Sequence, residues 1–316
     1  MSPTAAKTPL VFQDAAPLVE PQVNAAGIHE WPFNASMPID VRHLRFQKRA
    51  SQRMRRHDYL EIFYANKGGL VLQVGTKLIQ VNPGDLFVIG SHLFHRIAEY
   101  QGEDVRISVL YFMPELLRMH DGTGDGFEYL MPFLVQHDGF SHAIPAATGI
   151  PARSFECILN IGSRLPPIGG RDRAWIKTLL RLLVLQVGNH YLDYSRYREA
   201  AHQRKLQLDR LKPLFAAIDR DYDRPFSVEK AAKTLSMSKS HFMRSFKNVT
   251  GEAFTNYLNH FRVSKAEYLL ASTDLTIAEI SQIVGFCDQS YFGLTFRRFI
   301  GVTPTEYRRS LASTQV

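Results

Sequence analysis

Two stretches near the C-terminal end of the chain carry side chains that could contact nucleic acid. In one of them, the outward residues recur at helical spacing and are Ser290, Gly293, Leu294 and Arg297. This face is small or polar at its N-terminal end and basic further along, which suits a helix that enters a DNA major groove. The alternative is an ordinary two-helix hairpin with a solvated outer face.

The surrounding residues predict a helix-turn-helix that would hold this face in place. Thr276 and Glu279 form a capping box at the start of a first helix. Gly285 supplies the left-handed turn that ends this helix, and Asp288 caps the second helix. The inner faces of the two helices are apolar, with Ile277, Ile280, Ile283, Val284, Phe292, Phe296 and Phe299.

The same plan occurs earlier in the chain, at residues 227–258. Ser227 corresponds to Thr276, and Ser236 corresponds to Gly285. The outward residues of its second helix are Ser240, Met243, Arg244 and Lys247. The segment 252–272 between the two units predicts a helix of roughly 30 Å, close to one DNA turn of ~34 Å. Two tandem units could therefore enter successive major grooves, and a packing accident explains them poorly.

This C-terminal part of the sequence resembles the AraC/XylS family of transcription regulators. The motif residues are Gly285-Phe286, Ser290-Tyr291-Phe292, Phe296-Arg297-Arg298, Gly301, Pro304 and Tyr307-Arg308. The resemblance covers residues 208–309 and implies a seven-helix DNA-binding domain whose third and sixth helices read DNA. Those helices correspond to residues 238–247 and 288–299. The departures are Ser236, where a turn glycine is common, and Cys287 in the second turn.

The resemblance and the outward faces together give a set of expected DNA contacts. Arg244 is expected to reach a guanine edge, and Arg297 is expected to reach a phosphate. The full set is Lys239, Ser240, Met243, Arg244, Lys247, Gln289, Ser290, Gly293, Leu294, Arg297 and Arg298.

Length and composition predict two domains. A chain of 316 residues is long for one domain, and its formal charge of +8 fits a polyanionic partner. We expect a flexible arm, an effector-binding and dimerisation domain, a linker and a DNA-binding domain, at residues 1–27, 28–194, 195–207 and 208–312. The two cysteines lie far apart, which predicts no disulfide and a reducing compartment. No segment has the pattern of a secretory signal or a membrane span, so we expect a soluble, cytoplasmic protein.

The N-terminal half predicts many short strands with regular turns, which is typical of a sandwich or small barrel. The expected strands are Asp40–Phe46, Leu60–Ala65, Leu70–Gly75, Lys77–Val81, Leu86–Ile89 and Val105–Phe112. Residues 114–168 are irregular by pattern, apart from a short helix at 127–135. The expected fold is therefore α+β with two domains: a β-rich barrel with helices, followed by an all-α tandem helix-turn-helix domain.

Within these strands, two motifs resemble those of the cupin fold and cover residues 40–112. They are His57-Asp58-Tyr59-Leu60-Glu61 followed by Gly68, and Pro83-Gly84-Asp85 with His95. Family metal sites use a His-x-His pair, the glutamate and the later histidine, but Arg55 replaces the first histidine here. His57, Glu61 and His95 with a water could still hold a divalent metal. A guanidinium at Arg55 would repel that cation, so we favour hydrogen-bonding histidines and no metal.

The cupin resemblance implies an effector pocket in the interior of the barrel. The expected lining residues are Arg55, His57, Tyr59, Glu61 and His95. A guanidinium can bind hydroxyls or a carboxylate in fork geometry, and an aromatic ring can stack on a sugar face. We therefore expect a sugar or sugar acid as the effector.

A run without acids between residues 42 and 56 has three explanations. Its basic residues are Arg42, Arg45, Lys48, Arg49, Arg53, Arg55 and Arg56. A solvated strand face and loop is favoured over a pocket for an anionic effector, and accessory DNA contact comes last.

Residues Asp172–Tyr194 predict a helix that is apolar on more than one face. One side is expected to pack on the barrel, and the other on a second subunit, although core packing alone could explain both. The polar, basic segment 195–207 is expected to be the linker.

Together these features predict an effector-responsive transcription activator that is not an enzyme. Its expected partners are double-stranded promoter DNA, a small effector, RNA polymerase and a second copy of the chain. The alternatives are a cupin-type enzyme fused to a DNA-binding module and an effector-independent DNA binder.

Overall fold

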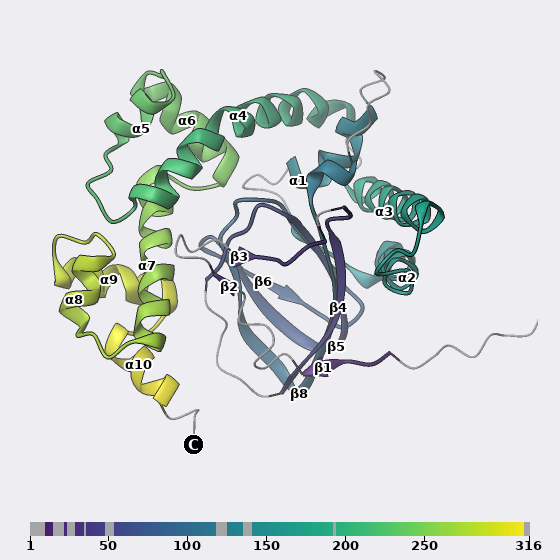
Figure 1. Ribbon diagram of the computed structural model, residues 1–316, viewed down its shortest axis with the longest axis horizontal. Coiled ribbons are helices and arrows are strands. Elements are labelled where there is room, and N and C mark those ends of the chain that lie inside the picture. The colour runs from purple at the N-terminus through teal and green to yellow at the C-terminus, as the bar shows by residue number, and fades with distance from the viewer. Residues whose placement is uncertain are drawn as a thin grey trace, which may run out of the picture.

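The N-terminal half of the molecule is a curved sheet flanked by helices, and the C-terminal half is helical (Figure 1). The computed structural model describes residues 10–14, 22–23, 29–34, 36–47, 54–117, 125–134, 141–191 and 194–312. Only residues 10–14 and 22–23 of the predicted N-terminal arm are therefore described. We call residues 29–191 the N-terminal half and residues 194–312 the C-terminal half.

Two long antiparallel strands, β5 and β8, form the centre of the sheet. The main strands are β4 (Ile39–Gln47), β5 (Leu60–Val74), β6 (Lys77–Val81), β7 (Leu86–Ile89) and β8 (His95–Phe112). The sheet order is β1-β4-β8-β5-β7-β9, and β6 pairs with β5. β1 (Gln13–Asp14) and β9 (Ala143–Ile144) end this path, and β2 (Gln22–Val23) pairs with β3 (His29–Glu30) separately.

The predicted β-rich N-terminal fold is confirmed, but its sheet is not closed into a barrel among the residues that the structure describes. The strands at the two ends of the sheet, β1 and β9, do not pair with each other. Instead the sheet curves, and its β5–β8 register shifts at Ala65–Lys67, Lys67–Gly69 and Val71–Leu72. At Gly68, where φ is +73°, an added Cβ would lie 2.8 Å from Val105 Cγ2, so glycine allows the close approach of these strands.

Strand boundaries also differ from the sequence prediction. The two expected strands at 60–65 and 70–75 form one strand, β5, and β8 begins at His95 rather than at Val105. Gly68 and Gly69 lie between the two expected strands, and the pairing of β5 with β8 continues across them. The predicted strands at 77–81 and 86–89 are confirmed as β6 and β7.

Helices cover one face of the sheet and bury a hydrophobic core there. These helices are α1 (Met131–Leu134), α2 (Ile150–Gly162) and α3 (Gly170–His190). Short 3-10 segments lie at Pro114–Leu117, Asp125–Leu130 and Ala146–Thr148. Helix α2 corrects the expectation that residues 114–168 are irregular, because its apolar side packs against β4 and β8. Helix α3 confirms the predicted helix, with its end at His190 instead of Tyr194.

A single helix, α4 (Tyr194–Asp221), leads from the N-terminal half into the C-terminal half (Figure 1). The segment 195–207, which was predicted as a linker, lies inside this helix. The predicted domain boundaries stay predictions.

The C-terminal half contains the two predicted helix-turn-helix units. The first comprises α5 (Val228–Thr234) and α6 (Lys239–Thr250), and the second comprises α8 (Ile277–Ile283) and α9 (Gln289–Ile300). Helix α7 (Phe254–Ser272) joins the units, and α10 (Pro304–Ala312) follows them.

Local signals in the sequence explain where these helices begin and turn. The side chain of Ser238 accepts a hydrogen bond from the His241 amide at the start of α6. The predicted capping box of Thr276 and Glu279 is confirmed at α8. Gly285 has a φ of +87°, and Ser236 adopts a similar left-handed φ of +53°. The two turns are thus alike despite the different residues. No helix among the described residues is both long and apolar enough to cross a bilayer.

Candidate functional site

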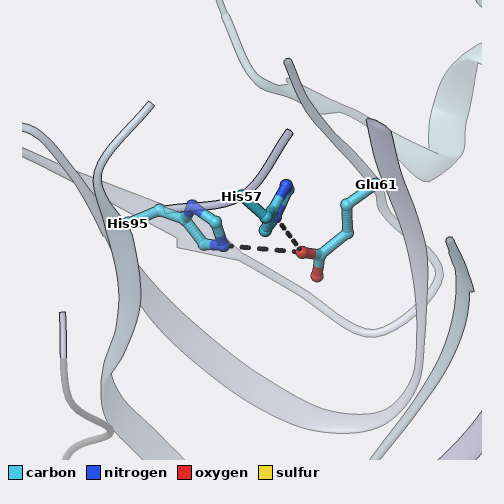
Figure 2. A group of neighbouring side chains, drawn as sticks. All are labelled: His57, Glu61 and His95. Carbon is cyan, nitrogen blue, oxygen red and sulfur yellow. Dashed lines mark hydrogen bonds and ion pairs between the residues drawn. The ribbon is translucent and has the colours of Figure 1, made fainter. Parts of the chain in front are cut away.

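Four of the five predicted effector residues come together from the segment that leads into β5 and from the start of β8, although these two strand ends are not paired in the sheet. Arg55 and His95 form an isolated antiparallel bridge, and Glu61 lies near the start of β5. Figure 2 shows the side chains of His57, Glu61 and His95 converging on one another. Arg55 is 8% exposed, and the other three are at most 2% exposed, so the cluster is buried. We call Arg55, His57, Glu61 and His95 the buried cluster.

The Glu61 carboxylate is the centre of the buried cluster. Its Oε2 lies 3.1 Å from His57 Nε2 and 3.4 Å from His95 Nε2 (Figure 2). Its Oε1 lies 3.6 Å from Arg55 Nη2, and Arg55 Nε donates a hydrogen bond of 3.2 Å to His95 Nε2. A buried carboxylate needs this compensation, because ionised groups are costly to desolvate alone.

Backbone carbonyls fix which nitrogen of each imidazole carries the proton. His57 Nδ1 lies 2.8 Å from the Tyr59 carbonyl oxygen, and His95 Nδ1 lies 3.0 Å from the Leu93 carbonyl oxygen. A carbonyl only accepts, so both Nδ1 atoms donate, and both Nε2 atoms face Glu61. His95 Nε2 accepts a hydrogen bond from Arg55 Nε. His57 Nε2 and Glu61 Oε2 lie 3.1 Å apart and are both acceptors, so a hydrogen bond between them requires a second proton on His57, and a cation could also bridge them.

Burial and charge shift the pKa values of the buried cluster in opposite directions. Burial lowers the pKa of His95 to about 4, and Glu61 only partly opposes this effect. Burial also lowers the pKa of His57. For the Glu61 carboxyl, burial raises the pKa, but the Arg55 guanidinium beside it lowers the pKa, which stays well below its ordinary value. Glu61 is therefore ionised and His95 neutral near pH 7.

Three residues of the buried cluster have the chemistry of a divalent metal site. One ligand atom each from His57, Glu61 and His95 lie within 4.8 Å of one another. Two imidazoles and one carboxylate suit several transition metals, and the Nδ1 bonds to carbonyls are the orientation that metal-bound histidines use. The Arg55 guanidinium competes for the same groups, because it contacts both His95 and Glu61. The donor set thus fits a metal, but only if Arg55 moves from its present contacts.

Aromatic rings form a wall beside the buried cluster. The Tyr59 ring stacks on His57 with centroids 3.8 Å apart and an interplanar angle of 6°. Phe33 contacts Tyr59 edge-on at 5.5 Å, and Trp31 lies 4.3 Å from Tyr111. The fifth predicted residue, Tyr59, is thus also next to the cluster, although the chain bends at residues 58–59 instead of continuing as a strand.

The basic run at residues 42–56 does not form one solvated face. Arg42 and Arg45 are partly exposed and pair with Asp40 and Asp104. Arg55 and Arg56 are buried, which corrects the favoured explanation for these two positions. Lys48, Arg49 and Arg53 lie outside the described residues.

The predicted DNA-contacting residues lie on open faces of α6 and α9. Exposed positions on these two helices are Lys239, Ser240, Met243, Arg244, Lys247, Gln289, Ser290, Leu294, Arg297 and Arg298, and Gly293 is partly exposed. Their opposite faces bury Phe242 and Phe246 on α6 and Phe292 and Phe296 on α9. Lys239 also forms an ion pair with Glu229 of α5. We call the exposed sides of α6 and α9 the two reading faces.

A further set of residues, which the sequence did not predict, joins the two halves. Arg56, Phe94 and Arg96 of the N-terminal half are buried against C-terminal helices. Their signal in the sequence is weak: Arg96, for example, is one of several polar residues at the start of β8. Their partners lie more than a hundred positions away, for example Tyr257 for Arg56 and Ile300 for Arg96.

Comparisons with known proteins agree with both halves of this arrangement. Residues 231–310 match the family described as helix-turn-helix domain, and residues 42–111 match the family described as cupin domain. The HTH-type transcriptional activator RhaR of an Enterobacter species is 30% identical over 263 residues, which cover 80% of this chain and 85% of that protein. RhaR of Klebsiella pneumoniae is 26% identical over 254 residues, which cover 80% and 86%.

Among solved structures, ToxT of Vibrio cholerae aligns with a TM-score of 0.49 and 15% identity, over 86% of this chain and 98% of that chain. The family assignment rests on the 30% identity to an HTH-type regulator along most of both chains. The matched cupin and helix-turn-helix domains support the same assignment. The chain belongs to the AraC/XylS family of transcription regulators and carries its DNA-binding domain at the C-terminal end.

Proposed function

We propose that this regulator is an activator that responds to a sugar or sugar acid bound at the buried cluster. The effector would contact Arg55, His57, Tyr59, Glu61 and His95, and the two reading faces would contact promoter half-sites. The activator role is supported by the name of the RhaR relatives, which are described as transcriptional activators. RNA polymerase would then be a further partner.

The convergence of the five side chains carries this proposal. A guanidinium, two imidazoles and a carboxylate offer donors and acceptors in one place, and the stacked Tyr59 offers a ring. These groups match the hydroxyls and the apolar face of a sugar, and the guanidinium also matches a carboxylate. Because the groups now satisfy one another, an effector would replace contacts such as that between Arg55 and Glu61.

A thermal-shift screen against sugars and sugar acids, followed by calorimetry, tests the effector. A ligand that binds only the native state raises the melting temperature. Arg55→Ala and His95→Ala should lose the calorimetric signal but keep DNA affinity measured without effector. The matched control is His142→Ala, which removes a buried imidazole that bonds to the Val88 carbonyl outside the cluster. Normal effector binding by both cluster variants would rule out the site.

A second candidate, a metal-dependent cupin enzyme fused to the DNA-binding module, is favoured by one observation. The ligand atoms of His57, Glu61 and His95 converge within 4.8 Å. Metal analysis of the purified protein, with Glu61→Gln as the control, separates the two proposals. We expect effector binding to survive chelation, whereas a stoichiometric metal whose removal abolishes binding would favour the second candidate.

We also propose a homodimer that forms through the outer face of α3. The inner face of this helix is buried in the core by Ile176, Leu180, Leu183, Val184 and Val187. Large apolar side chains remain exposed on its outer side, with Trp175 47%, Leu182 46% and Leu185 39% exposed. Their spacing of seven and three positions makes one stripe along the helix, as in helix pairs that associate.

A remaining alternative is a DNA binder whose N-terminal half only dimerises. DNA affinity that is the same with and without a ligand found in the screen would favour it.

A further inference from the structure

Two segments of the N-terminal half lie side by side between the buried cluster and the C-terminal helices. They are residues 54–57 and 92–96, which we call the interdomain ribbon. The Arg55 amide donates to the His95 carbonyl at 3.0 Å, and the His95 amide donates to the Arg55 carbonyl at 2.9 Å. Side chains alternate along extended chain, so neighbouring residues face opposite ways. Arg55, His57 and His95 face the buried cluster, whereas Arg56, Phe94 and Arg96 face the C-terminal half.

Arg56 fastens the ribbon to α4 and α7. Its side chain is 1% exposed, and its Nη1 donates a hydrogen bond of 3.1 Å to the Tyr257 hydroxyl of α7. Its Nη2 pairs with the Asp219 carboxylate of α4. The guanidinium also lies 4.9 Å from the ring centroid of Phe261. Arg56 thus holds α4 and α7 at one point.

Arg96 fastens the same ribbon to the C-terminal end of the second reading helix. Its Nη2 donates to the carbonyl oxygens of Phe299 and Ile300, at 3.3 Å and 3.2 Å. These carbonyls end α9 and lack partners within the helix. Gln73 orients the guanidinium by accepting from Arg96 Nε at 2.8 Å. A positive charge is favourable at this end of a helix.

Apolar and backbone contacts complete the attachment. Phe94 lies 4.9 Å from the ring of Tyr257 and 5.4 Å from that of His260. Met54 and Phe94 belong to the same hydrophobic cluster as the core of the first unit. The Met54 amide donates to the Glu267 carboxylate of α7 at 3.3 Å. The ribbon therefore contacts α4, α7 and α9.

We propose that Arg96 is a positioning residue for DNA binding, which sets the orientation of α9 against α4 and α7, the helices that Arg56 holds. Within the C-terminal half, the two units are joined through α7. The ribbon adds a second connection, from α4 and α7 at Arg56 to the end of α9 at Arg96. Both reading faces stay exposed while these contacts are made, so the attachment is compatible with bound DNA. A second unit that is already oriented loses less freedom on binding and binds more tightly.

The proposal does not require an effector, so its test uses DNA alone. The probe is a duplex selected from random-sequence DNA by the unmodified full-length protein, and hydroxyl-radical footprints accompany affinity measurements. The unmodified protein should protect two successive turns. Arg96→Ala should bind about ten-fold more weakly and lose protection only in the turn read by α9. Footprints of Arg244→Ala and Arg297→Ala assign each turn to its helix.

Matched variants separate positioning from a general loss of structure. Arg106→Ala removes an arginine from the same strand, β8, that pairs with Asp104 away from the C-terminal half, and it should leave both turns protected. Arg96→Lys keeps the charge and should restore part of the lost protection. If Arg96→Ala does not fold, the footprint of Arg96→Lys is compared with that of the unmodified protein instead. Unchanged affinity and footprint, tighter binding, or equal loss of both turns would each overturn the proposal.

Discussion

At the residue scale, the chemistry of this regulator depends on charges that are buried together. Glu61 is 2% exposed and stays ionised because the Arg55 guanidinium lies beside it. His95 stays neutral for the opposite reason, since burial disfavours its charged form. The charge state of each group in the buried cluster therefore depends on its neighbours, and the pH dependence of stability follows from these pKa shifts.

The stability of the N-terminal half should fall as the pH falls from 6.5 towards 4. The pKa of His95 is about 4 in the folded chain, below the unfolded value of about 6.5, so the unfolded state takes up the proton first. The stabilisation is complete above pH 6.5, and about 2 kcal/mol of it is lost by pH 5. Unfolding free energies measured from pH 7 to pH 5 should decrease, with a shallower slope for His95→Gln. Parallel slopes for the two proteins would contradict the assignment.

Gly285 should be far less replaceable than Gly301, although both have a positive φ of about 90°. At Gly301 an added Cβ meets nothing within 4 Å, so Gly301→Val suffers only backbone strain of roughly 1–3 kcal/mol. At Gly285 the Cβ would also lie 2.7 Å from the Asp223 carbonyl oxygen, which is backbone and cannot move aside cheaply. Gly285→Val should therefore destabilise the C-terminal half more, as measured by chemical denaturation with far-UV circular dichroism. Equal costs would show that the contact with Asp223 is unimportant.

At the element scale, each reading helix is an amphipathic cylinder with a fixed start. Asp288 accepts hydrogen bonds from the amides of Ser290 and Tyr291 at the N-terminus of α9. Ser238 does the same for His241 at α6. Because caps and buried phenylalanines fix the rotation of each helix, the exposed residues form a defined surface.

Arg244 and Arg297 should contribute to DNA binding in different ways. Arg244→Ala should cost ~1–3 kcal/mol and relax specificity at one position, as expected for a base contact. Arg297→Ala should weaken binding to all sequences and reduce the salt slope by about one, as expected for a phosphate contact. Titrations of a selected duplex across a salt series measure both effects. The control is Arg173→Ala, which removes an exposed arginine of α3 and should change neither the DNA affinity nor the salt slope. If Arg244→Ala and Arg297→Ala both bind DNA with unchanged affinity, the assignment is wrong.

At the scale of the whole molecule, the two halves are packed against each other as well as joined by α4. Arg56 and Arg96 carry the polar contacts, and Phe94 carries much of the apolar contact. Helix α3 lies on the far side of the sheet from the helix-turn-helix units (Figure 1). A dimer formed through α3 would thus leave both reading faces accessible.

Leu182→Asp should weaken the proposed dimer by roughly 100-fold, because a charge buried in an apolar interface costs about 3 kcal/mol. Sedimentation equilibrium of the full-length protein measures the change. Leu78→Asp is the matched control, since Leu78 is 67% exposed on β6 and away from α3. The stripe on α3 is not the interface if both variants associate as the unmodified protein does.

The sequence by itself determined those features that depend on near neighbours. The capping box at Thr276 and the turn at Gly285 were predictable because each involves residues only a few positions apart. The helical spacing of Phe292 and Phe296 likewise indicated which side of α9 is buried. The cupin motif also indicated side chains that converge in the fold, since alternation along a strand places Arg55 and His57 on one face and both contact Glu61.

Only the tertiary structure decided the features that depend on distant partners. Residues 60–74 form one strand instead of two because β8 pairs along them, and within the described part of the chain the sheet is open because its end strands do not pair. The sequence predicted Arg55 at the buried cluster but no partner for its neighbour Arg56, which contacts Tyr257 of α7. Such contacts join residues that are more than two hundred positions apart, and they contribute to stability only when packing brings those residues together.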